Sequence, residues 1–333
     1  MRGDTLRKTL GSGFPAPAPP NRQPLLPKSA DLWYNVRMKL NAYAKVNLIL
    51  NVLGKRPDGY HEVLMLMQAI SLCDLVTVEA RDPADRRPGE EGWLLRPADL
   101  EYGEKDLAWK AAVLMAETFA PQKLEGNAVR GVRILIEKHI PAAAGLAGGS
   151  ADAASVMIGL AKLWDLMKGP DCFAANDPGA SAAKNDALFA LLAPLGAKLG
   201  SDVPFCIASQ LGHTAAIASG RGTDLEFAAP TDCGVDLFFS DAVIPNKTAS
   251  VYRELKPEDC SPIYDIRAFL AAQTLAEKRA LMGNHLQAPA ERLLARMDKN
   301  RKAAQAAPAG LMLCGAGPTY FTIGDTGRFR TIL

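Results

Sequence analysis

Several features are missing from this sequence, and each absence excludes a class of protein. No apolar run approaches the roughly 18 residues that a membrane-spanning helix needs, because charged residues and glycines interrupt every such stretch. The net charge of +2 leaves no excess of one sign that would indicate binding to nucleic acid. We therefore expect a protein that binds neither membranes nor nucleic acid.

Cysteine is scarce, and no two cysteines are spaced as a redox or zinc motif requires. None of the six forms a C-x-x-C pair. Isolated cysteines in a long chain are typical of reduced core residues, which favours a cytoplasmic location. Apolar residues make up 48% of the sequence and charged residues 22%, as in ordinary globular proteins, and 333 residues are enough for two domains.

The N-terminal segment has few acidic residues and no long apolar stretch, but many prolines. Such a composition cannot bury much apolar surface and predicts a disordered extension over residues 1–37. The segment lacks the apolar core of a secretory signal, whereas its bias toward arginine and lysine leaves organelle targeting open. An alternative is that translation starts at Met38.

What the sequence does have is a run of small residues, Pro-Ala-Ala-Ala-Gly-Leu-Ala-Gly-Gly-Ser-Ala-Asp, at 141–152. A helix-compatible segment follows at 153–167. The free N–H groups at a helix N-terminus form an anion site, and glycine lets the backbone approach phosphate oxygens. We interpret the run as a phosphate-binding loop, with a ligand-free tight connection as the alternative. It matches neither the Walker A nor the dinucleotide-binding pattern.

The remaining pattern predicts an α+β fold, because strands and helices are mixed without regular alternation. Strands are predicted at 38–53, 75–79, 132–137, 214–217 and 236–240, and on both sides of a glycine turn within 311–323. Helices are predicted at 106–119, 153–167, 187–195, 266–282 and 288–301. A Gly-Arg-Gly loop at 220–222 indicates a domain boundary within residues 215–235.

Three separated polar residues suit phosphoryl transfer to a hydroxyl. Lys45 and Asn47 lie two apart on a predicted strand, so both point to one face. Asp202 lies in a predicted loop bounded by Gly200 and Pro204. An aspartate can accept or orient the hydroxyl proton, and a lysine can stabilise charge on the moving phosphoryl group. Taken singly, the lysine could be a solvated charge and the aspartate a turn former.

Five motifs occur in order over residues 39–323. They are Ala44-Lys-Val-Asn-Leu48, Arg56-Pro-Asp-Gly-Tyr-His61, the small-residue run at 141–154, Gly200-Ser-Asp-Val-Pro-Phe205 and Gly315-Ala-Gly-Pro-Thr319. Together they make the chain resemble the GHMP superfamily of small-molecule kinases. The first two motifs narrow the resemblance to the family of 4-diphosphocytidyl-2-C-methyl-D-erythritol kinases.

The resemblance implies a two-domain GHMP kinase fold. Residues 38–220 would form an ATP-binding domain like domain 2 of ribosomal protein S5, and residues 221–333 a ferredoxin-like C-terminal domain. The implied activity is ATP-dependent phosphorylation of the 2-hydroxyl of 4-diphosphocytidyl-2-C-methyl-D-erythritol, a step of the non-mevalonate isoprenoid precursor pathway. Mg²⁺ is expected with ATP, but no metal ligand can be named.

The same resemblance assigns roles to residues. Asp202 would be the catalytic base and Lys45 its partner. Asn47 would hydrogen-bond the methylerythritol part, and Thr248 would line the substrate site. Tyr60 and Tyr252 would stack on the cytosine, and His61 would contact its polar edge. The implied ATP-binding residues are Pro141, Ala143, Ala144, Gly145, Leu146, Ala147, Gly148, Gly149, Ser150, Ala151 and Asp106, with Ser150 as helix cap or phosphate ligand.

Three positions depart from the family pattern. Asp106 stands where the family usually has asparagine, His285 where an acidic residue is usual, and Cys314 where serine is common. None involves the Lys45 and Asp202 pair, so we expect activity to survive. A kinase of the homoserine or mevalonate type and a non-catalytic nucleotide-binding protein remain alternatives. We expect only a small-molecule substrate as partner, and a monomer or homodimer.

Overall fold

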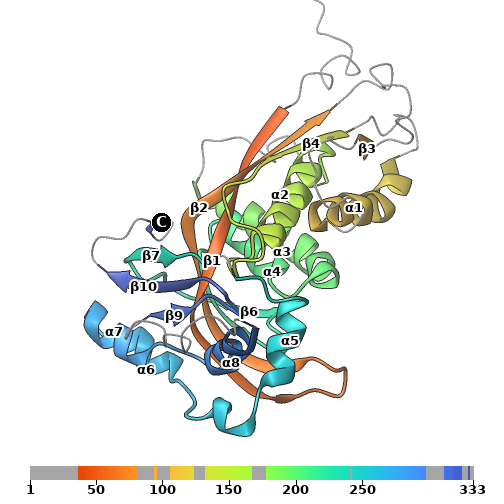
Figure 1. Ribbon diagram of the computed structural model, residues 1–333. Helices are drawn as coiled ribbons and strands as arrows, with labels where there is room; N and C mark the ends of the chain where they lie inside the picture. The colour runs from red at the N-terminus through yellow and green to blue at the C-terminus, as the bar shows by residue number, and fades with distance from the viewer. Residues whose placement is uncertain are drawn as a thin grey trace, which may run out of the picture.

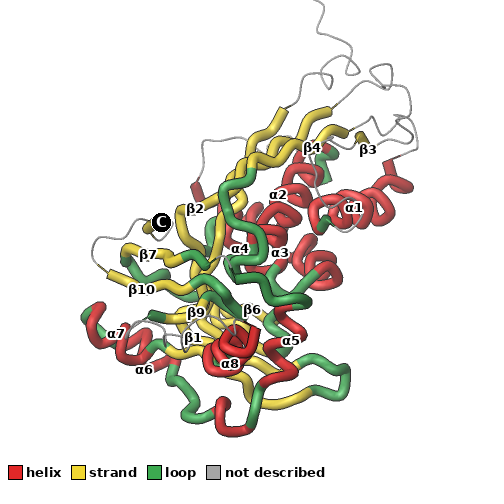
Figure 2. Tube along the Cα trace, in the orientation of Figure 1, coloured by secondary structure: helices red, strands yellow, loops and turns green. Residues whose placement is uncertain are grey.

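The computed structural model describes residues 37–80, 94–95, 106–123, 132–166, 178–240, 242–297, 311–324 and 329–330. Apart from Arg37, the predicted N-terminal extension lies outside these residues, as do the last residues of the helices predicted at 153–167 and 288–301. The described residues confirm the α+β fold, with two sheets and helices grouped beside them (Figures 1 and 2).

A long antiparallel hairpin is the backbone of the first sheet (Figure 1). It consists of β1 (Arg37–Lys55) and β2 (His61–Ala80), so the strand predicted at 75–79 is the end of a longer one. The full path is β3-β4-β2-β1-β8, with β5 pairing with both β2 and β6. The added strands are β3 (Leu94–Leu95), β4 (Val132–Glu137), β5 (Ala215–Ser219), β6 (Asp224–Phe227) and β8 (Gly283–Asn284).

The second sheet is smaller and has the order β11-β7-β10-β9. Its strands are β7 (Gly234–Phe238), β9 (Met312–Leu313), β10 (Tyr320–Gly324) and β11 (Phe329–Arg330). The turn between β9 and β10 is the predicted second glycine turn. β6 and β8, both beyond residue 220, belong to the first sheet, so both parts of the chain contribute to it.

Four helices gather beside one end of the hairpin, on the right in Figure 2. They are α1 (Leu107–Lys123), α2 (Gly148–Leu163), α3 (Pro178–Leu199) and α4 (Val203–Gln210). The prediction placed the start of α2 at 153, but the helix begins inside the glycine run at Gly148. α3 extends well beyond the predicted 187–195, and α4 was not predicted.

The other helices follow β7. They are α5 (Lys247–Glu254), the short 3₁₀ helix η4 (Pro257–Cys260), α6 (Ile266–Ala271), α7 (Leu275–Leu281) and α8 (Gln287–Met297). The single helix predicted at 266–282 is therefore two helices. The break has a local cause, because Thr274 and Glu277 form a capping box that starts α7.

Close packing of α2 on the hairpin fixes the glycine run in place. Almost the whole helix is buried, and half of its buried residues are alanine, serine or glycine. At Gly159 an added Cβ would lie only 2.7 Å from Val78 Cγ2, so the helix backbone approaches β2 more closely than a larger residue allows. The start of α2 is thus held against the sheet. No helix in the described part of the chain is long and apolar enough to cross a bilayer.

Candidate active site

A pocket of about 1550 Å³ lies where β1, the start of α2, the start of α4, α5 and the second glycine turn meet. Seventeen of the eighteen residues proposed above for catalysis, substrate and ATP line it, from Lys45 and Asn47 on β1 to Tyr252 on α5. The exception is Ala151, which is fully buried in the hydrophobic core, so its contact with ATP stays a prediction. Thr248 is exposed where it lines the pocket.

The first glycine turn, residues 143–147, adopts a conformation that presents backbone to the pocket. Ala143, Gly145 and Ala147 all have positive φ, at 55°, 85° and 60°. Ala147 is the N-cap of α2 and makes no side-chain capping bond, so the prediction of Ser150 as the cap is wrong. The first helical hydrogen bond runs from Ala151 N to Ala147 O, and helix geometry leaves the three preceding N–H groups without an intrahelical acceptor. These groups and the helix dipole suit an anion.

The second glycine turn, residues 314–317, packs directly against the first. An added Cβ at Gly145 would lie 2.0 Å from the carbonyl oxygen of Cys314. At Gly315, whose φ is 54°, an added Cβ would lie 3.2 Å from Gly145 O and 3.8 Å from Lys45 Nζ. Burial raises the pKa of the Cys314 thiol, which therefore stays neutral. The contact explains why both turns need glycine.

Lys45, Asn47 and Asp202 meet as the sequence predicted. Lys45 Nζ donates to Asn47 Oδ1 at 2.8 Å and lies 3.5 Å from Asp202 Oδ1. Lys45 is almost wholly buried, whereas about a third of the Asp202 side chain is exposed. Asp202 lies in the predicted turn after Gly200 and is the N-cap residue of α4, which begins at Val203, and its carboxylate makes no capping bond. A carboxylate held by a buried ammonium thus faces the pocket.

Tyr252 and Tyr60, the two residues predicted to stack on the cytosine, each contact another side chain in the structure. The ring of Tyr252 stacks on His61, with centroids 4.6 Å apart and planes at 26°. The guanidinium of Arg221 lies 5.3 Å from the centroid of Tyr60, which is half-exposed. A base stacked on Tyr252 would use the face opposite His61 or displace the imidazole. Burial and the charge of Lys55 lower the pKa of His61, so the ring is neutral at neutral pH.

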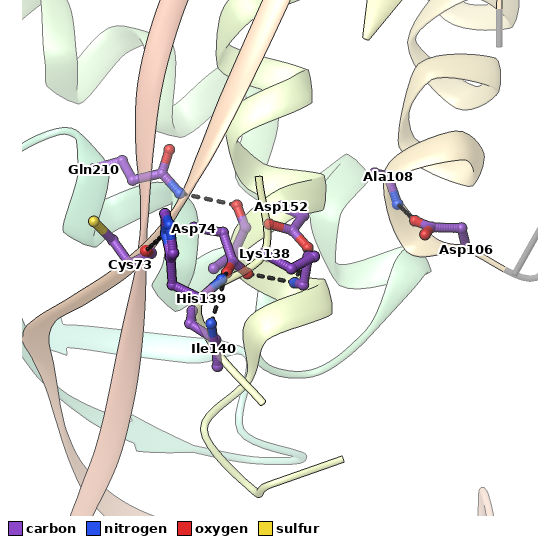
Figure 3. A network of polar contacts seen from close by, with 10 residues as sticks. Cys73, Asp74, Asp106, Ala108, Lys138, His139, Ile140, Asp152 and Gln210 are labelled. Atoms are coloured by element: carbon purple, nitrogen blue, oxygen red, sulfur yellow. Dashed lines mark hydrogen bonds and ion pairs between the residues drawn. The ribbon is translucent and has the colours of Figure 1, made fainter. Parts of the chain in front are cut away.

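A network of charges holds the segment that leads into the first glycine turn (Figure 3). Lys138 Nζ donates to Asp152 at 2.6 Å and also pairs with Asp74. Asp74, fully buried on β2, accepts from the backbone N–H groups of His139 and Ile140. The sequence carries no local signal for this network, because Asp74 and Lys138 are 64 residues apart. It ties the residues just before the turn to the hairpin.

Burial acts in opposite directions on the two partners of this network, yet the pKa of each ends up raised. At Asp152, burial outweighs the attraction of Lys138 and raises the pKa to about 7. At Lys138, burial lowers the pKa, but the two carboxylates together outweigh it and leave the pKa raised. One oxygen of Asp152, Oδ1, is buried and has no hydrogen-bond partner among the described residues.

The structure shows the surroundings of the three residues that depart from the family pattern, Asp106, His285 and Cys314. Asp106 accepts from Ala108 N at 2.7 Å and so caps the start of α1, as Figure 3 shows. His285 is buried, accepts from Val52 N at 2.9 Å through Nδ1 and contacts Pro262 O at 3.0 Å through Nε2, which therefore carries the proton. It does not line the pocket. Cys314 belongs to the second glycine turn.

Five cationic residues that line the pocket were not predicted: Lys55, Lys138, Arg221, Lys247 and Arg253. Of these, Lys247 lines the pocket from α5 and Arg221 from the loop between β5 and β6. Neither lies in one of the five motifs, and a single lysine or arginine carries no pattern of its own in the sequence. Only the fold brings them to the site.

Comparison with known proteins gives consistent matches. Residues 106–210 match the family model of the GHMP kinases N terminal domain. The chain is 37% identical over 298 residues to a 4-diphosphocytidyl-2-C-methyl-D-erythritol kinase of Alkaliphilus metalliredigens, covering 86% of this chain and 88% of that protein. It is also 37% identical over 293 residues to a protein of the same name from Geobacillus kaustophilus, with the same shares covered.

Solved structures agree with the sequence matches. A crystal structure of 4-(cytidine 5′-diphospho)-2C-methyl-D-erythritol kinase superposes with a TM-score of 0.60 at 34% identity, over 85% of this chain and 89% of that one. A homoserine kinase from Cytophaga hutchinsonii superposes with a TM-score of 0.54 at 15% identity, over 87% of this chain and 85% of that one. The second likeness concerns the fold alone.

Proposed function

Because this chain belongs to the 4-diphosphocytidyl-2-C-methyl-D-erythritol kinase family, we propose that it transfers the γ-phosphoryl group of ATP to the 2-hydroxyl of 4-diphosphocytidyl-2-C-methyl-D-erythritol. The observation that carries the proposal is the pairing of Lys45 with Asp202 at 3.5 Å in a pocket that the first glycine turn also lines. The reaction is a step of the non-mevalonate isoprenoid precursor pathway.

Asp202 and Lys45 would divide the work at the hydroxyl. Asp202 accepts the hydroxyl proton, or orients it, as the substrate oxygen attacks the γ-phosphorus. The bond from that phosphorus to the bridging oxygen breaks and ADP leaves. Lys45 holds the carboxylate in position and offers positive charge beside the transferred group. Asn47, which accepts from Lys45, fixes the ammonium and lies where it can contact the substrate.

The first glycine turn would hold ATP. The free N–H groups at the start of α2 suit the phosphates, and the small residues of the turn let the backbone approach them. Ser150, in the first turn of the helix, adds a hydroxyl that lines the pocket. Asp106 lines the pocket from the start of α1, and we assign it to the nucleoside, with one oxygen already used for capping.

The cytidyl end would lie at the aromatic residues. Tyr252 and His61 form a stacked pair, and Tyr60 lies in the turn between the hairpin strands. Aromatic faces give affinity for a base, while a neutral imidazole can donate to or accept from its polar edge. An acceptor without a base, such as homoserine or mevalonate, has no use for these rings. Thr248 completes the substrate side from α5.

ATP chemistry of this kind uses Mg²⁺, and Asp152 is the residue that fits as its protein ligand. Its Oδ1 atom is buried, lacks a hydrogen-bond partner among the described residues, and belongs to a side chain that lines the pocket. Within the described ranges no group of three or more His, Cys, Asp or Glu could hold a metal alone, so phosphate oxygens and water would complete the coordination. When bound, the ion would neutralise phosphate charge.

Further expectations from the sequence belong to the same proposal. We assign residues 38–220 to an ATP-binding domain and residues 221–333 to a C-terminal domain. We also propose a cytoplasmic enzyme, supported by its scattered cysteines, that acts as a monomer or homodimer on a small molecule without nucleic acid or membrane partners.

The experiment that tests the proposal is an acceptor panel. Purified protein is incubated with ATP, Mg²⁺ and 4-diphosphocytidyl-2-C-methyl-D-erythritol, homoserine or mevalonate, and ADP release is measured. We expect ADP release well above the acceptor-free rate with the cytidyl compound alone. Release with homoserine or mevalonate instead would reassign the substrate, and ATP binding without release for any acceptor would indicate a non-catalytic protein.

A further inference from the structure

Lys247 occupies a place in the pocket that no motif assigns. It is the first residue of α5 and follows Asn246, whose left-handed φ of 46° turns the chain into the helix. The half-buried side chain runs toward the two glycine turns rather than into solvent.

The ammonium of Lys247 joins the two glycine turns. Nζ donates to the carbonyl oxygen of Ala143 at 2.7 Å and to that of Gly317 at 2.7 Å. One acceptor belongs to the proposed ATP loop and the other to the second glycine turn. Both acceptors are neutral, so two of the three N–H groups are used while the charge stays uncompensated.

Two other lysines of the pocket, the buried Lys45 and the partly exposed Lys138, are paired with carboxylates. Lys45 pairs with Asp202, and Lys138 pairs with Asp74 and Asp152. Lys247 forms no ion pair with any carboxylate in the described ranges. Burial, together with the charge of Lys45, lowers the pKa of Lys247 to about 8, against a smaller opposite effect of Asp202. A half-buried cation held by neutral groups favours an anionic ligand.

We propose that Lys247 is a catalytic residue that donates its third N–H to an oxygen of the phosphoryl group during transfer. The proposal rests on the proposed kinase function. As the substrate oxygen bonds to the γ-phosphorus, the proton passes to Asp202, the bond to the bridging oxygen of ADP breaks, and charge is redistributed over the transferred oxygens. Lys45 and Lys247 would then hold that group from two sides, one from β1 and one from α5.

A set of substitutions separates this role from that of a structural link. Lys247→Gln keeps a donor that can reach a carbonyl but removes the charge, Lys247→Met removes both, and Lys247→Arg keeps the charge. Lys256→Met is the control, because Lys256 is half-exposed and pairs only loosely with Glu258, at 3.8 Å. For each protein we would measure kcat, the KM of each substrate, the dissociation constant of ADP and the melting temperature.

We expect kcat to fall about 10²-fold in both Lys247→Gln and Lys247→Met, as for removal of one transition-state donor. The KM of the cytidyl substrate and the affinity for ADP should change by less than about threefold, since neither ligand itself contains the phosphoryl group that Lys247 would contact. Lys247→Arg should recover part of kcat, and Lys256→Met should match the wild type. A loss confined to the KM of the cytidyl substrate would place Lys247 at its diphosphate and overturn the proposal.

The pH profile gives a readout that a structural link would not change. The charged groups facing Lys247 are Lys45 on β1 and Asp202 before α4, while the neighbouring Cys314 is neutral. Because Lys247 must be protonated, kcat/KM should fall as pH rises through about 8, and Lys247→Arg should shift that fall to higher pH.

Two outcomes distinguish failure of this proposal from failure of the proposed function. Wild-type protein that transfers no phosphoryl group to any acceptor would refute the function, and the role of Lys247 with it. An active wild type whose Lys247→Gln variant keeps full kcat would leave the function intact and reduce Lys247 to a link between the turns. A lowered melting temperature with normal kcat would likewise reduce Lys247 to such a link.

Discussion

Replacing Gly145 by alanine should destabilise the protein through the contact between the two glycine turns. The residue has a φ of 85°, and a Cβ there would lie 2.0 Å from Cys314 O and 3.0 Å from Gly317 O. Ordinary van der Waals contact begins at 3.4 Å, so the Cβ and the Cys314 oxygen would have to separate by about 1.4 Å. Both obstacles are backbone atoms, which cannot move aside as a flexible side chain can.

The loss of stability expected for Gly145→Ala has a conformational part and a steric part. A left-handed backbone costs a residue with a Cβ about 1–2 kcal/mol. Forcing an extra carbon into a packed region costs about 1–3 kcal/mol more. Gly59→Ala is the matched control, because Gly59 has a φ of 86° and no atom within 4 Å of an added Cβ. We therefore expect a loss of about 2–5 kcal/mol at Gly145 and only about 1–2 kcal/mol at Gly59.

Urea unfolding of both variants and the wild type measures these losses. Trp109 and Trp164 pack against the core around α2, and their fluorescence reports the unfolding of that region. We expect a clearly lower unfolding midpoint for Gly145→Ala than for Gly59→Ala. Equal destabilisation by the two substitutions, within about 0.5 kcal/mol, would refute the close packing of the two turns.

Two further substitutions test other parts of the site. Tyr252→Ala should weaken binding of the cytidyl substrate by between several-fold and about a hundredfold, because stacking on one base contributes about 1–3 kcal/mol. ADP binding should be unchanged. The test is titration of both ligands into this variant, with Tyr252→Phe as the control. Equal losses for the two ligands would contradict the assignment. Lys138→Met should lower the free energy of unfolding by at least about 2 kcal/mol, because it leaves the buried Asp74 and Asp152 without their cation. The control, Lys256→Met, should change the free energy of unfolding by less than about 0.5 kcal/mol. Similar unfolding midpoints for these two variants would show that the buried network does not stabilise the fold.

Short sequence segments were enough to predict those helices and strands that depend mainly on their own residues. The strand predicted at 132–137 matches β4 in both bounds, and the spacing of Lys45 and Asn47 placed both side chains on one face. The small-residue run predicted a turn before a helix, but not that the helix starts at Gly148. Glycine and alanine suit either a turn or a closely packed helix, and burial against β2 decides between them.

Contacts between distant segments could not be predicted from the sequence. The segment after Asp202 contains Pro204 and suggested a loop, whereas proline near the first position of a helix is favourable and α4 begins there. The pairing of Asp74 with Lys138, the stacking of His61 on Tyr252 and the position of Lys247 all depend on the path of the whole chain. Motifs identified the proposed catalytic pair, and the fold identified its neighbours.

The central claim is that Asp202, held by Lys45, acts on the acceptor hydroxyl, and Asp202→Asn tests it most directly. Asparagine keeps the size of the side chain but cannot accept the proton. The measurement is the single-turnover rate of phosphoryl transfer to 4-diphosphocytidyl-2-C-methyl-D-erythritol, with ATP binding followed in the same preparation. We expect a rate reduced about 10²–10⁴-fold with ATP binding unchanged. A rate close to that of the wild type would contradict the claim.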